Sequence, residues 1–180
     1  MWRRLFGALS ILVAVASPVW GADLSVTIGV LPDADRTPGR INPDVTQQNI
    51  KRTICRPGWT ATIRPPTSYT NALKKRQIDE YGYRDKKPAS YEEDHLISLQ
   101  LGGHPRDSRN LWPEPYNITC GARVKDVVET KLKILVCAGR MTLSKAQELI
   151  ATNWVAAYSE YVDSKGCKAL RKRSPKRIRT

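Results

Sequence analysis

The four cysteines constrain the fold of this chain more than any other sequence feature. Cys55, Cys120, Cys137 and Cys167 are an even number and include no C-x-x-C pair, which argues against a structural zinc site. They follow a segment with the features of a secretory signal, and secreted domains use paired cysteines as disulfides. We therefore expect two disulfides and a secreted or periplasmic location.

Residues 1–22 have the pattern of a signal peptide. Two arginines precede an apolar run over residues 5–16, and the small residues Gly21 and Ala22 offer a cleavage point. The run is too short to span a bilayer comfortably, and an uncleaved anchor is the alternative interpretation. We expect a single domain over 23–167 with no stable membrane span after signal cleavage.

The amino-terminal half predicts strands, a loop and one helix. Alternation of apolar and polar residues predicts a strand over 23–32. A second strand is predicted over 60–64, where Pro65 and Pro66 end it. The region 33–46 is rich in Asp, Pro and Gly and is typical of a loop. A helix is predicted over 71–81, with Thr70 as its N-cap.

The carboxy-terminal half predicts a helical hairpin. The first helix covers 121–137, and its apolar face consists of Val124, Val127, Val128, Leu132 and Leu135. The second helix starts at a capping box formed by Ser144 and Gln147 and runs to about Val162. Its apolar stripe consists of Leu149, Ile150, Trp154, Ala157, Tyr158 and Tyr161.

Helix geometry narrows the pairing of the cysteines. Cys120 and Cys137 lie at opposite ends of the first predicted helix, roughly 25 Å apart at 1.5 Å per residue. Bridged Cα atoms lie within about 7 Å of each other, so this pair is excluded. The short connection over 138–143 makes the two helices antiparallel and returns Cys167 close to Cys120. We therefore favour the pairs Cys120–Cys167 and Cys55–Cys137.

Residues 91–115 carry the chemistry of the chain and read YEEDHLISLQLGGHPRDSRNLWPEP. Asp94 and His95 come first, two glycines supply a turn, and Asn110 is followed by Leu111 after a polar loop. This D-H…G-G…N-L pattern resembles the HNH nucleases, whose ββα-metal site has the same order of strand, loop, strand and helix. The resemblance covers residues 91–135, and the surrounding chain is also similar to a group of secreted bacterial proteins that carry this segment.

The resemblance implies hydrolysis of phosphodiester bonds, which needs an attacking water, a base and a cation. His95 would be the general base, since an ordinary pKa of about 6.5 leaves it neutral at physiological pH. Asp94 would bind a divalent metal ion, Mg²⁺ in the first place, with Mn²⁺ or Zn²⁺ as alternatives. Asn110 would brace the loop so that His95 faces the scissile phosphate. The last histidine of the family pattern is absent, and Asn117 or Asp126 is the expected second metal ligand.

The charge distribution points to a polyanionic partner. The chain carries 30 Lys and Arg against 17 Asp and Glu, a net charge of +13. Seven of the positive charges lie in residues 168–180, which contain no acidic residue and predict a disordered basic arm. Arg106, Arg109 and Lys125 are candidate contacts to nucleic acid phosphates, with ordinary surface charge as the alternative.

Together these observations predict an α+β fold with a small ββα-metal, HNH-like core over 91–135. Additional strands would precede the core, and a disulfide-stapled helical hairpin would follow it. The expected function is a secreted metal-dependent endonuclease that cleaves DNA or RNA with little sequence preference. The first alternative is a degenerate module that binds nucleic acid or envelope polyanions without cleavage. A second alternative is a secreted structural protein in which Asp94, His95 and Asn110 only hold a loop together.

Overall fold

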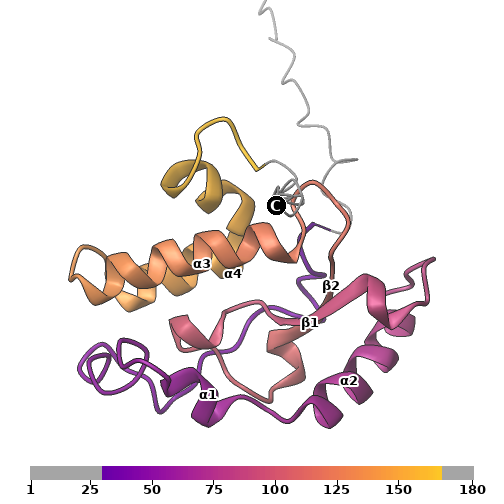
Figure 1. Cartoon of the computed structure of the whole chain (residues 1–180), viewed down its shortest axis with the longest axis horizontal. Coiled ribbons are helices and arrows are strands. Elements are labelled where there is room, and N and C mark those ends of the chain that lie inside the picture. The colour runs from indigo at the N-terminus through magenta and orange to yellow at the C-terminus, as the bar shows by residue number, and fades with distance from the viewer. Residues whose placement is uncertain (1–29, 168–180) are drawn as a thin grey trace, which may run out of the picture.

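The computed structural model describes residues 30–167 and shows a mixed fold of helices with one small sheet (Figure 1). The predicted signal peptide over 1–22, most of the predicted strand over 23–32 and the basic arm over 168–180 lie outside the described residues. The helices are α1 Trp59–Ile63, α2 Thr67–Glu80, α3 Ala122–Cys137 and α4 Leu143–Tyr161, the strands are β1 Tyr91–His95 and β2 Leu111–Pro115, and the 3₁₀ helices are η2 Pro88–Ser90, η3 Leu99–Leu101 and η4 Ser108–Asn110.

The sheet is a two-stranded antiparallel hairpin. Its register pairs Tyr91 with Pro115 at one end and His95 with Leu111 at the other. The long loop over 96–110 connects the strands, and α3 follows β2 after a short turn. The described part of the chain therefore contains the order strand, loop, strand and helix that the sequence predicted.

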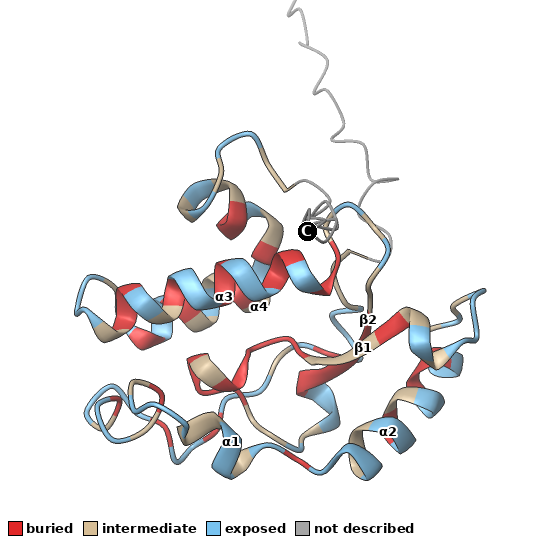
Figure 2. Ribbon diagram, viewed as in Figure 1, coloured by how far each residue is buried: buried red, intermediate tan, exposed pale blue. Residues whose placement is uncertain are grey.

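The hairpin lies between α2 on one side and the antiparallel pair α3 and α4 on the other (Figure 1). Two strands alone would leave both faces of the sheet open to water, so packing on both sides is what stabilises them. Buried residues recur along α3 and along the hairpin (Figure 2). The centre of the core joins apolar side chains from both helices, among them Val128, Leu132, Ile150 and Trp154.

The segment 60–64 forms helix α1 and not the predicted strand. The Arg64 N–H donates to the Thr60 carbonyl, and the Thr62 hydroxyl donates to the Trp59 carbonyl. A single helical turn satisfies these backbone groups locally, whereas a strand would need a partner to pair with. The local sequence that predicted a strand here is therefore overruled by the surroundings.

Helix ends differ from the predictions by a few residues. Helix α2 begins at Thr67 with Pro66 as its N-cap, so Thr70 is an interior residue. Helix α4 is capped by Thr142, whose hydroxyl accepts from the Lys145 N–H at 3.2 Å, and not by Ser144. On α3, Val127 is 37% exposed. The buried face of α3 instead includes Val136, which the sequence analysis did not select.

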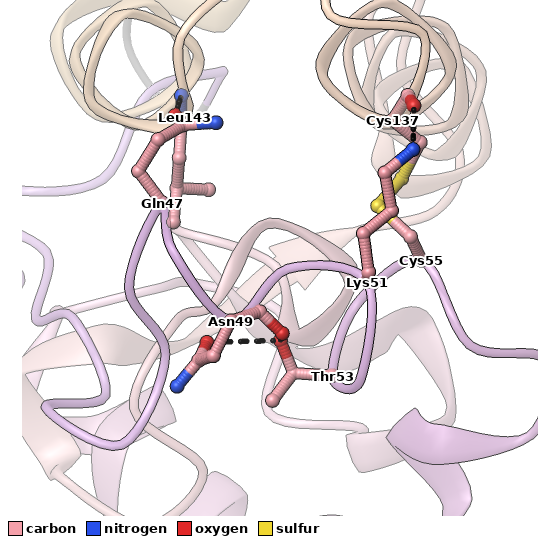
Figure 3. Close-up of a disulfide and its surroundings, with 7 residues drawn as sticks. All are labelled: Gln47, Asn49, Lys51, Thr53, Cys55, Cys137 and Leu143. Atoms are coloured by element: carbon pink, nitrogen blue, oxygen red, sulfur yellow. Dashed lines mark hydrogen bonds between the residues drawn. A yellow bond between two sulfur atoms is a disulfide. The ribbon is translucent and has the colours of Figure 1, made fainter.

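The disulfide prediction is confirmed. Cys55 bonds to Cys137, Cys120 bonds to Cys167, and the Cα atoms are 5.6 Å apart in each pair. The first disulfide attaches the amino-terminal segment to the end of α3, where Lys51 Nζ also donates to the Cys137 carbonyl at 3.2 Å (Figure 3). The second attaches the chain beyond α4 to the turn before α3.

Within residues 30–167, no helix combines the length and the apolar character needed to cross a membrane.

Candidate active site

Asn110 organises the loop between the two strands. Its Oδ1 accepts from the backbone N–H groups of Ile97 at 3.0 Å and Arg40 at 3.2 Å. Its Nδ2 donates to the carbonyls of Ile97 and His104, both at 3.0 Å. The side chain has no exposed surface, and these four bonds use both lone pairs and both hydrogens of its amide. Asn110 therefore joins three separate stretches of backbone around the loop.

The two glycines let the backbone of this loop approach itself closely. A Cβ atom on Gly103 would lie 1.6 Å from the Ile97 carbonyl oxygen and 2.9 Å from Asn110 Nδ2. Gly102 adopts a φ of +75°, which favours glycine, and a Cβ there would meet Val45 at 2.8 Å. The pair is therefore required by the close packing around Asn110.

His95 closes β1 and is 5% exposed. Its Nε2 lies 3.0 Å from the carbonyl oxygen of Pro105. A carbonyl only accepts hydrogen bonds, so Nε2 carries the proton and Nδ1 of the neutral ring has the lone pair. Burial lowers the pKa of His95, and the hydrogen bond to Pro105 opposes this only in part. The imidazole is therefore neutral at neutral pH and has a basic nitrogen to which no described residue is hydrogen-bonded.

The loop that provides the Pro105 carbonyl is itself held in place. His104 Nδ1 accepts from the backbone N–H groups of Arg106 at 3.2 Å and Asp107 at 2.9 Å. The hydroxyl of Tyr69 in α2 donates to the Arg106 carbonyl at 2.6 Å. These contacts fix the acceptor for His95 Nε2, and with it the orientation of the ring.

Lys125 of α3 is the second centre of the site and has no exposed surface. Its ammonium donates to Asp94 Oδ2 at 2.5 Å, to the His95 carbonyl at 2.8 Å and to Glu129 Oε1. Three acceptors satisfy the three ammonium hydrogens. Burial alone would lower the pKa of Lys125, but the negative charges of Asp94 and Glu129 raise it above its usual range. The side chain is therefore a permanent buried cation.

Carboxyl groups outnumber this cation. Glu114 is fully buried, and no N–H group or hydroxyl among residues 30–167 donates to its oxygens, but its protonated form shares a hydrogen bond with Asp94. Burial and then the negative charge of Asp94 raise the pKa of Glu114 well above its usual value. Burial raises the pKa of Glu129 to about 7, although the neighbouring Lys125 opposes the shift. Asp94 differs: burial acts to raise its pKa, but the charge of Lys125 and the hydrogen bonds from Lys125 and Glu114 together lower it.

Asp94 and His95 both line one cleft of about 260 Å³. Successive residues of a regular strand face opposite ways, but β1 ends at His95, so strict alternation does not continue there. Residues from α1, the loop and α3 complete the cleft, namely Thr60, Arg64, Glu92, Ser98, Leu99, Gln100, Asp126, Glu129 and Lys133. The cleft is large enough for a small polar group such as a phosphate diester.

The structure separates the predicted metal ligands. Asp126 lines the cleft with Asp94, whereas Asn117 is exposed and lines a different pocket beside Tyr83 and Tyr91. Asn117 stands beyond the far end of the hairpin, so the expectation that it joins Asp94 is not met.

The structure corrects one of the predicted phosphate contacts and leaves the other two at the surface. Lys125 is buried and bonded to carboxylates, so it is not a surface contact to nucleic acid. Arg109 is exposed and paired with Asp107 at 2.8 Å, and Arg106 lies over the ring of Tyr69 at 5.8 Å. None of these three predicted contacts is among the residues that line the cleft.

The sequence analysis missed the cations that do line the cleft. Arg64 follows α1 and Lys133 lies on α3. No motif marks either residue, because only the fold brings the end of α1 and the helix α3 to the same cleft. The burial of Lys125 did have a signal, since Lys125 falls on the same helical face as Val128 and Leu132.

The residues do not fit the expected divalent metal site as they are placed. Asp94 Oδ2 is held by Lys125, and Asn117 is remote. Among the described residues, no group of three or more His, Cys, Asp or Glu side chains is placed to hold an ion. Glu92 and Asp126 do line the cleft, where burial and then the negative charge of Asp94 raise the pKa of both carboxyls.

No family model, curated protein or solved structure matches this chain in the comparisons.

Proposed function

We propose that this protein is an HNH-like endonuclease that hydrolyses phosphodiester bonds of DNA or RNA with little sequence preference. The observation that carries the proposal is the hydrogen bonding and the position of the His95 ring. Its Nε2–H is bonded to the Pro105 carbonyl, while the basic Nδ1 belongs to a neutral ring that lines a polar cleft. This is the arrangement that a general base needs.

In the proposed reaction His95 Nδ1 takes a proton from a water molecule in the cleft. The hydroxide forms a bond to phosphorus, the P–O bond to the leaving group breaks, and the leaving oxygen takes a proton from solvent. The hydrogen bond between Nε2 and Pro105 keeps the ring oriented while Nδ1 gains its proton. The positive charge that develops on the ring is compensated in part by Asp94, which lies beside it.

The order of the elements supports an HNH-like unit. Strand β1 brings Asp94 and His95, β2 follows the loop braced by Asn110, and α3 packs against the hairpin. The resemblance gave Asn110 the role of bracing the loop, and its four hydrogen bonds suit that role. The structural proposal is that residues 91–135 form the catalytic unit.

A secreted or periplasmic location fits the two disulfides, which persist in oxidising compartments. Nucleic acid is the proposed partner because the chain carries a net charge of +13. Residues 168–180 would add affinity that falls steeply with salt.

The test is a cleavage assay with the purified, oxidised protein. Supercoiled plasmid and a single-stranded RNA are incubated with the protein in Mg²⁺, in Mn²⁺ and in EDTA. We expect one of the two substrates to be cut, and we expect His95→Ala to abolish the cutting while its circular dichroism spectrum stays that of the wild type. Full activity of a folded His95→Ala protein would refute the assignment of the base.

A protein that retards the plasmid in a gel under every condition without cutting it would favour the binding module over the enzyme. Deletion of residues 168–180 should then weaken the retardation, and the effect should shrink as salt is raised. A protein that neither binds nor cuts nucleic acid would refute both readings.

A further inference from the structure

We propose that the ammonium group of Lys125 takes the position of the metal ion in this site, so that hydrolysis at His95 does not require a divalent cation. The inference rests on the proposed nuclease function. It concerns which cation the site uses, and its test separates that question from whether the protein is a nuclease.

The oxygen ligands of Lys125 are those that a metal ion would take. One is the carboxylate Asp94 Oδ2, one is the carboxylate of Glu129, and one is the backbone carbonyl of His95. Carboxylates and carbonyls are the ligands that hard divalent cations prefer. In this protein a covalently attached cation already binds all three.

This cation also performs the structural task of a metal ion. It connects α3 to the end of β1 through the Asp94 side chain and the His95 main chain. The position of the His95 backbone is therefore set by Lys125, and the orientation of its ring is set by Pro105. Lys125 is a positioning residue in this account, since it has no exposed surface with which to touch a substrate.

A divalent ion at Asp94 would have to share that carboxylate with Lys125. Two cations on one carboxylate repel each other, and the repulsion is strong where water is excluded. Of the two expected second ligands, Asn117 is absent from the cleft, whereas Asp126 lines it and already feels the charge of Lys125. The sharing of Asp94 with Lys125 therefore favours the ammonium as the resident cation.

Other groups are placed to bind the substrate phosphate. Arg64 and Lys133 line the cleft from opposite elements, α1 and α3. Arg64 is close enough for its charge to contribute to lowering the pKa of His95. A guanidinium and an ammonium are the usual protein donors to phosphate oxygens, and they would take up the charge that develops there.

The experiment begins with the wild-type protein, freed of metal by dialysis against EDTA. We expect the same cleavage rate in EDTA as in Mg²⁺, whereas loss of a catalytic metal would lower the rate by orders of magnitude. We also expect Mn²⁺ to leave the melting temperature unchanged, because a ligand that binds the folded state would raise it. Cleavage that stops in EDTA and returns with Mg²⁺ would overturn the inference.

The melting-temperature measurement tests metal binding independently of cleavage activity. If Mn²⁺ raises the melting temperature of the wild type but not of Asp94→Asn, then Asp94 holds a metal and the inference is wrong, whether or not the protein cleaves. If cleavage is insensitive to EDTA and is lost in His95→Ala, the inference and the proposed function both stand. If EDTA abolishes cleavage that also needs His95, only the inference fails.

The variant Lys125→Ala tests whether a metal ion can take the place of the ammonium group. Lys125→Ala frees Asp94 and Glu129, so Mn²⁺ should raise its melting temperature above the metal-free value, unlike that of the wild type. Lys133→Ala, at the rim of the same cleft, should behave as the wild type does toward Mn²⁺. Mn²⁺ that stabilises Lys125→Ala no more than the wild type would contradict the claim. If Lys125→Ala does not fold, the wild type and Asp94→Asn decide the question.

Discussion

The amide of Asn110 connects more of the site than any other single side chain, because its four hydrogen bonds go to backbone groups of Arg40, Ile97 and His104. Buried backbone groups that lose their partners cost about 1–3 kcal/mol each. Asn110, which matches the family pattern in the sequence, therefore also holds the loop together in the structure.

We expect Asn110→Ala to lower the free energy of unfolding by about 3 kcal/mol or more. Urea denaturation followed by circular dichroism measures the loss. The control is Asn71→Ala, at an exposed position in α2, where alanine is the better helix former and the change should be neutral or slightly stabilising. Equal unfolding free energies for the two variants would contradict the bracing role.

Glu93 gives the site a pH dependence of stability. Both carboxylate oxygens are buried, and neither has a hydrogen-bond partner in the described part of the chain. Burial raises the pKa of Glu93 to about 8 from its usual 4.5, although Lys74 opposes the shift. Between these two pH values the folded protein holds a proton that the unfolded chain releases. The stability associated with Glu93 is therefore full below about pH 4.5 and is lost as the pH rises to about 8.

We expect Glu93→Gln to flatten the fall in melting temperature between pH 5 and pH 9, and to be more stable than the wild type at the alkaline end. Differential scanning calorimetry at a series of pH values measures both effects. Glu80→Gln, an exposed substitution in α2, should leave the wild-type curve unchanged. A Glu93→Gln curve parallel to that of the wild type would show that Glu93 ionises normally.

At the scale of the elements, the connection between β1 and β2 is more sensitive to added volume than the other turns. Gly103→Ala would place a Cβ atom 1.6 Å from the Ile97 carbonyl, so the loop around Asn110 has to rebuild. Gly139→Ala is the matched control, since Gly139 has a φ of +71° but no atom within 4 Å of the added Cβ.

For Gly139→Ala we expect a loss of about 1–2 kcal/mol, the cost of a left-handed conformation for an L-residue. For Gly103→Ala we expect a much larger loss of stability, together with loss of cleavage, because the Pro105 carbonyl moves with the loop. Thermal unfolding and plasmid nicking measure the two properties. A Gly103→Ala protein as stable as Gly139→Ala would show that the contact is easily relieved.

A helix whose apolar residues recur over several turns was predictable from the sequence. The helix over 121–137 matches α3 to within a residue, and its length decided the pairing of the cysteines. The strand predicted over 60–64 was wrong: among residues 30–167 the sheet consists of β1 and β2 alone, so this segment has no described strand to pair with, and the local sequence does not contain that information. Capping positions shifted for the same reason: serine is the stronger cap in isolation, yet α4 begins after Thr142.

Residues of the candidate site that belong to the sequence motif were predictable. Residues that only the packing of the fold brings to the site were not. Asp94 and His95 line the same cleft, and Asn110 holds the loop that follows His95. Arg64 lines the same cleft as residues of α3 although the two segments are far apart in the sequence, and no local pattern encodes that proximity. Lys125 was assigned to the surface by its residue type, although its position on the apolar face of α3 indicated burial.

At the scale of the whole molecule, distant segments of the chain build the site together. The segment around Arg40 lies against the loop before β2, with the Asn42 N–H bonded to the Gly102 carbonyl and the His104 N–H bonded to the Arg40 carbonyl. The same amino-terminal region is attached to α3 by the disulfide Cys55–Cys137 (Figure 3). The loop that orients His95 is therefore enclosed by covalently linked parts of the chain.

Removing either disulfide should lower the free energy of unfolding by about 4 kcal/mol, because each restrains a long loop of the unfolded chain. The sequence separations are 82 residues for Cys55–Cys137 and 47 for Cys120–Cys167. The longer loop predicts a loss about 0.5 kcal/mol larger for the first pair. Urea denaturation of the two double-serine variants measures this. Variants as stable as the wild type would show that neither bond contributes to the stability of the fold.

The central claim is that His95 is the base, and the chain's only other histidine supplies the control. His104→Asn keeps a side-chain acceptor for the N–H groups of Arg106 and Asp107 while removing the imidazole. The decisive measurement is the initial rate of plasmid nicking by wild type, His95→Ala and His104→Asn at one protein concentration. We expect His95→Ala to be slower by a factor of about 100 or more, and His104→Asn to cut at nearly the wild-type rate. Equal rates for His95→Ala and the wild type would contradict the account.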